Sequence, residues 1–314
     1  MATSTGSGGP RLLAVAGGKG GVGKTFVAAN LAASMASSGQ KVIAVDADLE
    51  GANLHTTLGV PPPRESLADF VASREEDLRK LALPTPIPNL RLIAGTHGHM
   101  ADAQPDEVRR VRLIRALRQL DADWVILDLG PGQHGATLDY FLVADDGLLV
   151  MNPEPGSVEN TYGFLRAAFY RRLRQSVVSE ALRDLIGEAM DPRNEQGIRT
   201  PQELLHEVEQ SDPAEGARFL RAVADFHPRF VINSVRSAED IRLGFSVSSV
   251  CRRYFGVEVE YLGYVNHDEA ARKSISARKP LVRFAHEADA AIYLERIARK
   301  LCGPPPAVTM ERST

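Results

Sequence analysis

A glycine-rich segment near the start of the chain constrains the fold more than any other feature. Residues 18–25 read Gly-Lys-Gly-Gly-Val-Gly-Lys-Thr, after the apolar run 12–16 and before a helical pattern over 26–38. This is the GxxxxGK[ST] phosphate-binding loop in its required setting, between a buried strand and a helix. The glycines let successive backbone N–H groups face phosphate oxygens at the positive end of that helix. The segment therefore predicts a nucleotide site.

The loop also predicts roles for its side chains. We expect Lys24 to neutralise charge on the β- and γ-phosphates and the Thr25 hydroxyl to bind Mg²⁺. The alternative, a glycine-rich turn that binds nothing, is disfavoured by an eight-residue match in the right context. The residues expected to contact ATP or ADP are Gly18, Gly20, Gly21, Val22, Gly23, Lys24, Thr25 and Phe26.

Composition excludes several classes of protein. The 314 residues are 44% hydrophobic and 25% charged, as in an ordinary soluble globular protein, and no apolar run is long enough to span a membrane. A net charge of −3 argues against a globally basic nucleic-acid binder, though not against a local basic patch. The two cysteines, Cys251 and Cys302, form no CxxC pair and no disulfide framework, which fits a cytoplasmic location.

Buried-type strands alternate with helical patterns, which predicts an α/β fold with a mainly parallel sheet flanked by helices. Two of the strands, 41–46 and 124–128, end in Asp46 (with Asp48 two residues on) and in Asp128. Ligands of parallel sheets gather at the carboxyl ends of strands, so these acids are expected near the phosphate loop. Asp128, at the end of an apolar strand, is expected to bind Mg²⁺ through a coordinated water.

The domain organisation predicted from composition is simple. Residues 1–10 are small and polar and are expected to be disordered, 11–302 to form one P-loop domain, and 303–314 to form a flexible tail. Within the domain, 176–228 is mostly helical and rich in Glu and Asp, and it is predicted to be a helical insertion. Residues 66–83 are predicted to form surface helices.

Two further patterns leave alternatives open. Helix 107–120 carries an apolar stripe, and its arginines lie largely on the other side; helix 162–173 adds more arginines. Such faces are either simply solvated or a docking surface for DNA, anionic lipid or an acidic partner. Loop residues His97 and His99 lack a third ligand, so we expect no metal there. The stripe consists of Val108, Val111, Ile114, Leu117 and Leu120.

Lys19 lies inside the phosphate loop and gives the KGGxGK[ST] form, which resembles the deviant Walker A motif of the MinD/ParA ATPases. The resemblance implies that Lys19 reaches across a dimer interface to the partner's nucleotide. It assigns Asp48 to orienting the attacking water and Asp46 to supporting the Mg²⁺ side. It also places Asn233 against adenine, although the loop 266–268, which lacks the family's proline, is an open alternative for that contact.

The stretch 152–157 resembles a segment of the family's dimer face, where a Glu approaches the partner's nucleotide. This role would fall to Glu154. A plain helix N-terminus, with Ser157 as its cap, explains the segment equally well. Within the family, residues 128–132, 138–142 and 153–173 look most like the flagellar-number and polar-positioning (FlhG/FleN-like) branch. The first ten residues lack that branch's partner-activating motif, and the tail lacks its membrane-targeting helix.

The resemblance implies an ATP-hydrolysing dimerisation switch, slow and stimulated by a partner, that controls the position or number of a flagellum or of cell-pole machinery. It implies an ATP-dependent homodimer, recruited to the cell pole, membrane surface or nucleoid. An unknown protein partner would bind the 176–228 segment or the arginine-rich helices. Two alternatives remain: a nucleotide-binding scaffold or adaptor with little hydrolysis, and a ParA-like cargo-positioning ATPase associated with DNA.

Overall fold

The computed structural model describes residues 9–95, 105–190, 201–255 and 257–303. Most of the predicted disordered N-terminus and flexible tail, and both His97 and His99, lie outside these ranges. Eight strands form one sheet with the order β3-β4-β2-β5-β1-β6-β7-β8. The strands are β1 Arg11–Ala16, β2 Val42–Ala47, β3 Leu83–Pro84, β4 Leu90–Ile93, β5 Trp124–Leu129, β6 Asp146–Met151, β7 Arg229–Val235 and β8 Glu260–Asn266.

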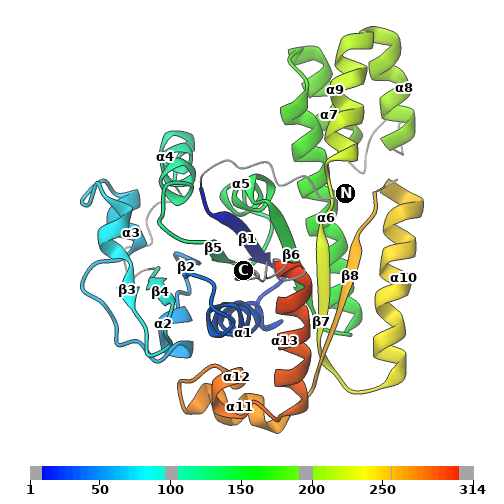
Figure 1. The fold of residues 1–314 in the computed structure, drawn as a ribbon. Coiled ribbons are helices and arrows are strands. Elements are labelled where there is room, and N and C mark those ends of the chain that lie inside the picture. The colour runs from blue at the N-terminus through cyan, green and yellow to red at the C-terminus, as the bar shows by residue number, and fades with distance from the viewer. Residues whose placement is uncertain (1–8, 96–104, 191–200, 256, 304–314) are drawn as a thin grey trace, which may run out of the picture.

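All neighbouring strands pair in parallel except β3, a two-residue edge strand that runs antiparallel to β4. The mainly parallel α/β fold is therefore confirmed. The central strands are almost continuous apolar runs because helices cover both faces of the sheet (Figure 1). On one face pack α1 Lys24–Ser37, α2 Leu54–Thr57, α11 Glu269–Ser276, α12 Leu281–Phe284 and α13 Asp289–Cys302.

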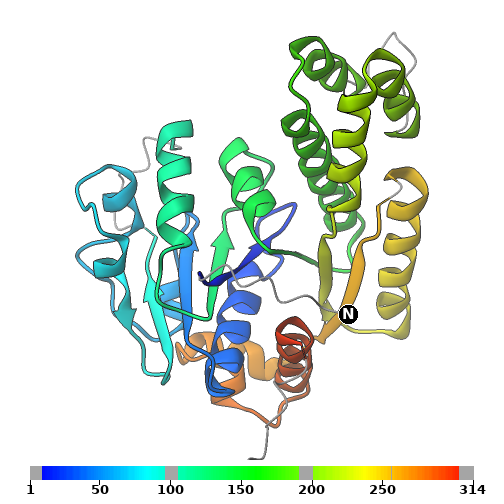
Figure 2. The same ribbon diagram turned by 45° about the horizontal axis from the view of Figure 1, so that its top comes forward.

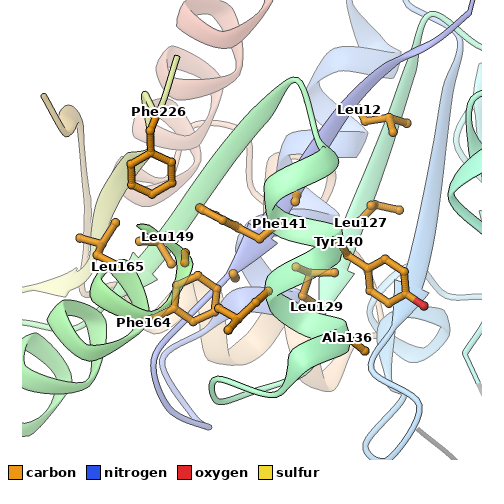
Figure 3. Close-up of a cluster of buried hydrophobic side chains, with 14 of the residues drawn as sticks. Leu12, Leu127, Leu129, Ala136, Tyr140, Phe141, Leu149, Phe164, Leu165 and Phe226 are labelled. Carbon is orange, nitrogen blue, oxygen red and sulfur yellow. The ribbon is translucent and has the colours of Figure 1, made fainter. Parts of the chain in front are cut away.

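The other face carries the remaining helices of the layered domain. They are α3 Leu67–Val71, η1 Leu78–Leu81, α4 Glu107–Leu117, α5 Gly135–Val143, α6 Pro155–Ser176 and α10 Ala238–Phe255. Aromatic rings fill the space between α5, α6 and the sheet (Figure 3). Phe141 meets Phe164 edge to face at 5.1 Å and lies against β6 at Gly147, where a Cβ would come within 2.5 Å of its ring. A glycine is needed there for this packing.

The segment 176–228 is helical, as predicted. It forms α7 Glu180–Met190, α8 Pro201–Ser211 and α9 Pro213–Ala224, which stand together with the end of α6 at one corner of the molecule (Figures 1 and 2). Their apolar side chains join the same core cluster as the sheet. Buried Glu215 accepts the Val178 N–H with both carboxylate oxygens at 3.1 Å, and Phe169 contacts Phe226 at 5.6 Å. The bundle α7–α9 is thus packed against α6 and is not merely connected to it through the chain.

Two sequence predictions are wrong in detail. The apolar stripe of helix 107–120 is rotated: Val108 and Val111 are 78% and 40% exposed, whereas Leu113 and Leu117 are buried. The helix packs against the core through Leu113 and Leu117, and this orientation leaves most of its arginines outside the core. Residues 66–83 form two short surface helices, α3 and η1, before β3 begins at Leu83, but these helices also cover core, because Phe70 is buried.

Asp139 of α5 ties three helices together. Its carboxylate accepts two hydrogen bonds from Arg171 of α6, at 2.6 and 2.8 Å, and pairs with Arg110 of α4 at 3.0 Å. The carboxylate is only 13% exposed, so water can replace little of this pairing.

We therefore expect Asp139→Ala to lower the free energy of unfolding by about 1–3 kcal/mol, because two half-buried guanidinium groups lose their partner. The matched control is Asp225→Ala, whose carboxylate is 72% exposed and lies 3.8 Å from Arg172; it should cost under about 0.5 kcal/mol. Urea denaturation of the three proteins measures both values. Equal losses in the two variants would contradict this account.

Candidate functional site

The phosphate loop joins β1 to α1 and depends on glycines for close contacts. Gly23, immediately before the helix, has φ 96°, and a Cβ there would lie 2.3 Å from the Asn233 amide nitrogen. A Cβ on Gly18 would lie 2.2 Å from the Asn160 carbonyl carbon in α6. The loop is therefore held between α6 on one side and the end of β7 on the other, with α1 directed at the space it encloses.

Lys24 and Thr25 begin α1 and lie beside Asp128 of β5. The Lys24 side chain is mostly buried, which lowers its pKa, while the charges of Asp128 and Asp48 act in the opposite direction. The Thr25 hydroxyl hydrogen-bonds to Asp128. A lysine and a threonine in these places can reach a phosphate and its cation from the same end of the helix.

Asp46 and Asp128 lie opposite each other on neighbouring strands β2 and β5, and both are buried. Burial raises the pKa of both carboxyls, that of Asp46 to about 7; the charge of Asp48 raises the pKa of Asp46 further, and the charge of Asp46 raises that of Asp128. Asp46 accepts hydrogen bonds from the backbone N–H groups of Leu54 (2.9 Å) and Asp48 (3.2 Å). The Asp128 Oδ1 atom has no hydrogen-bond partner among the described residues.

This carboxylate pair fits Mg²⁺. Two adjacent buried acids with an unsatisfied oxygen favour a cation, and the Thr25 hydroxyl supplies a further oxygen donor. Across the described ranges no group of three or more His, Cys, Asp or Glu side chains could hold a metal. The remaining ligands would thus be phosphate oxygens and water, as is usual for Mg²⁺ in nucleotide sites.

Asp48 follows β2 and faces the loop after β5. Its Oδ1 atom accepts hydrogen bonds from the N–H groups of Gly51 (2.9 Å) and Glu50 (3.3 Å), so the carboxylate is folded back over its own loop. A Cβ on Gly130 would lie 3.3 Å from the same oxygen. The predicted water-orienting acid therefore lies between the loop after β2 and the loop after β5.

Lys19 forms an ion pair with Glu154 of the same chain, at 3.0 Å between Nζ and Oε2. The two residues that the sequence assigned to a partner's nucleotide are thus neighbours within one subunit, and their side chains are 36% and 62% exposed. The helix that follows begins at Pro155, so Ser157 is not its cap as the alternative interpretation held. Ser157 is buried in the first turn, where its hydroxyl accepts the Asn152 N–H at 3.0 Å.

Asn233 is buried at the end of β7, and its amide nitrogen donates to the Val22 carbonyl of the phosphate loop at 2.9 Å. The next residue, Ser234, has φ 61°, and the pairing of β7 with β8 shifts register here. This bulge directs Asn233 toward the loop. In the 266–268 loop, by contrast, the Asn266 amide donates to Asp289, and Asp268 caps α11 through the Ala270 N–H.

The structure also shows contacts that no sequence pattern indicated. The second turn of α6, at Asn160 and Thr161, packs on Gly18, and Gly163 on the same helix lies against Gln133 of the loop after β5. One helix thus contacts both the phosphate loop and the loop after β5. Nothing in the local sequence of α6 marks these positions, because they are defined by a helix crossing that is remote in the chain.

Most arginines on α4 and α6 contact their own chain. Arg112 of α4 stacks on Phe70 at 4.2 Å, and Arg118, directly after α4, pairs with Asp145 at 2.5 Å. On α6, Arg171 binds Asp139, and Arg172 donates to the Ala222 carbonyl at 2.8 Å. The structure therefore gives most of these arginines a structural role that the sequence left open.

No helix within the described ranges is both long and apolar enough to cross a bilayer.

Comparison with known proteins agrees with this geometry. The AAA domain family (AAA_31) matches residues 10–173. Antiactivator FleN of Pseudomonas aeruginosa is 25% identical over 294 residues, 93% of this chain and 86% of FleN. Flagellum site-determining protein YlxH of Helicobacter pylori is 31% identical over 167 residues, 51% of this chain and 54% of that protein. MinD from Pyrococcus horikoshii, solved with Mg-ADP, superposes with a TM-score of 0.65 at 22% identity, covering 94% and 98% of the two chains.

We predict that Asp128→Asn stabilises the nucleotide-free protein, by about 1–2 kcal/mol at pH 8, because a neutral amide replaces a carboxylate that is costly to bury. The same variant should lose the extra stability that Mg²⁺ adds to the ADP-bound protein. Thermal unfolding with ADP, with and without Mg²⁺, measures both effects. A variant that is less stable without nucleotide, or that keeps the Mg²⁺ response, would contradict the predicted cation site.

Proposed function

The chain belongs to the AAA domain family (AAA_31) and has MinD and ParA proteins among its relatives, and on that premise we propose that it is an ATP-hydrolysing dimerisation switch. One observation carries the proposal. Lys24, Asp46 and Asp128 converge beside the phosphate loop, with Asp48 linking the two loops that flank it. A scaffold that only binds nucleotide needs the loop but not this arrangement of acids.

The proposed chemistry follows from the positions of these side chains. Lys24 neutralises charge on the transferred phosphoryl group, and Asp48 orients the water that attacks it. Asp46 and Asp128 would hold Mg²⁺ together with the Thr25 hydroxyl, and the cation would neutralise charge on the phosphates. Asp48 must first leave the N–H groups of Glu50 and Gly51, which requires its loop to rearrange when ATP is present.

Dimerisation would depend on the ion pair between Lys19 and Glu154. Both side chains are partly exposed, so the pair contributes little stability and can exchange for a stronger contact. The triphosphate of a facing subunit offers Lys19 such a contact, and Glu154 then lies at the same interface. Hydrolysis removes the γ-phosphate and lets each lysine return to its own glutamate.

We infer that Asn233, rather than the 266–268 loop, contacts adenine. One amide hydrogen of Asn233 is engaged by the Val22 carbonyl, which leaves its carbonyl oxygen to accept from the adenine amino group. Guanine carries an oxygen at that position and would be rejected. In the alternative loop the side chains of Asn266 and Asp268 are already engaged with their own chain.

The biological role we propose is control of the position or number of a cellular structure. FleN is named as an antiactivator, YlxH as a flagellum site-determining protein and MinD as a septum site-determining protein. A MinC:MinD complex among the structural neighbours is consistent with recruitment of a protein partner by such a switch. A DNA-associated role is less well supported, because most arginines of α4 and α6 contact their own chain.

The dimer prediction is tested by molar mass from light scattering, with ADP or ATP and Mg²⁺. We expect Asp48→Ala to form a dimer only with ATP, because the γ-phosphate persists, and the wild type to be mostly monomeric while it releases phosphate. Asp48→Ala combined with Lys19→Ala should stay monomeric with ATP. A mass that is independent of nucleotide in all three proteins would favour the scaffold alternative.

The base contact is tested by competition of ADP and GDP for a fluorescent ADP analogue. We expect Asn233→Ala to weaken ADP binding by about tenfold, the loss expected for one well-placed hydrogen bond, and to reduce the preference for ADP over GDP. The matched control, Asn266→Ala, should leave that preference unchanged. The reverse pattern would assign the adenine contact to the 266–268 loop.

A further inference from the structure

A cavity of about 120 Å³ lies between the loop after β2 and the loop after β5. Its described walls come from α3, the start of α4, α5 and the ends of both strands, and they include no residue of the phosphate loop. Ala68 and Val71 of α3, Leu129 of β5 and Ala136 of α5 make much of the surface apolar. This volume is similar to that of engineered cavities, about 150 Å³, that bind benzene.

Two hydroxyl groups line the cavity without a hydrogen-bond partner. Thr137 is 9% exposed and Tyr140 is 5% exposed, yet neither hydroxyl takes part in a hydrogen bond with any described residue. Figure 3 shows the Tyr140 hydroxyl pointing out of the apolar cluster that holds its ring. Neither oxygen is among the fully buried side-chain atoms that lack a partner, so each is accessible to water or to a ligand in the cavity. Burial raises the pKa of Tyr140, so its hydroxyl remains protonated and can donate.

The charges around the cavity are divided between its walls. Asp48 and Glu50 lie in the loop after β2, whereas Arg74 and Arg109 come from the helical side, and their side chains are 49% and 42% exposed. Each arginine also has an acidic neighbour, Asp69 at 3.2 Å and Asp106 at 3.8 Å. Asp48 and Glu50 repel an anionic group on their side of the cavity, so such a group would lie on the side of the arginines.

We propose that this cavity binds a small apolar carboxylic acid, with one aromatic ring or a short alkyl chain. The apolar part occupies the space between Val71, Leu129 and Ala136. The carboxylate accepts hydrogen bonds from the Thr137 and Tyr140 hydroxyls. Such a ligand bonds to both hydroxyls at once, which neither a hydrocarbon nor a partner's apolar side chain would do.

The position of the cavity gives such a ligand a regulatory role. Its walls include Asp48 from one loop and Gly130 with Pro131 from the other, so a bound acid contacts both segments that flank the γ-phosphate position. Occupancy would hold Asp48 in its folded-back conformation and slow phosphate release. This consequence rests on the proposed ATPase function, whereas the binding site itself does not.

Binding is tested by ligand-observed NMR and calorimetry on the full chain without nucleotide, with benzoate and hexanoate as probes. We expect saturable binding of at least one probe to the wild type. Tyr140→Phe and Thr137→Val should each weaken it by about tenfold, since each removes one hydrogen bond to a carboxylate. Ala68→Phe, which fills the cavity from a half-buried position on α3, should abolish it.

The matched control is Tyr264→Phe, which removes a tyrosine hydroxyl elsewhere, where it bonds to Tyr293 at 2.8 Å; probe affinity should not change. No saturable binding of either probe, equal affinity for toluene, or unchanged affinity in Ala68→Phe would overturn the proposal. Phosphate release with and without the bound probe is a separate measurement. If the probes bind but release is unaffected, the site stands and only its regulatory role is refuted.

Discussion

The structure depends on keeping two carboxylates side by side in the interior of a parallel sheet. Asp46 and Asp128 face each other across β2 and β5, away from water, and one oxygen of Asp128 has no hydrogen-bond partner among the described residues. Two buried acids repel each other and lose their hydration, so the arrangement lowers the stability of the nucleotide-free protein. A bound cation reverses that cost. The strand order makes this arrangement of carboxylates possible, because that order places the ends of β2, β5 and β1 next to one another.

The second constraint is steric. The phosphate loop approaches the α6 backbone so closely that Gly18 has no room for a side chain, and Gly23 has none beside Asn233. Loop, helix and β7 therefore form one packed unit. Lys19 and Glu154 lie at its exposed edge, where an ion pair is weak enough to be exchanged. Tight packing thus holds the phosphate contacts in place, while the contacts expected to change with the nucleotide remain near solvent.

Sequence reasoning recovered what local patterns determine. The strand–loop–helix motif and the acids at strand ends could be predicted because a phosphate loop and a parallel sheet impose short-range rules. The exposed face of α4 could not, since Val108 and Leu113 are equally apolar and only tertiary packing decides which is buried. The same holds for Ser157, whose hydroxyl binds a backbone N–H instead of capping the helix, and for the arginines that pair with Asp139. The assigned roles of Lys19, Asp48 and Asn233 remain predictions, although the structure places all three around the loop.

Helix α6 begins at the nucleotide edge of the sheet and runs for 22 residues, about 33 Å, to the opposite edge. The bundle α7–α9 follows the far end of α6 in the chain, which then returns to the sheet at the amino end of β7. Evolution can therefore lengthen, shorten or replace these three helices without displacing a residue that holds the nucleotide. Within a lineage, such a position allows new binding specificities to be tried on an unchanged P-loop domain, so this bundle is where we expect orthologues to diverge first.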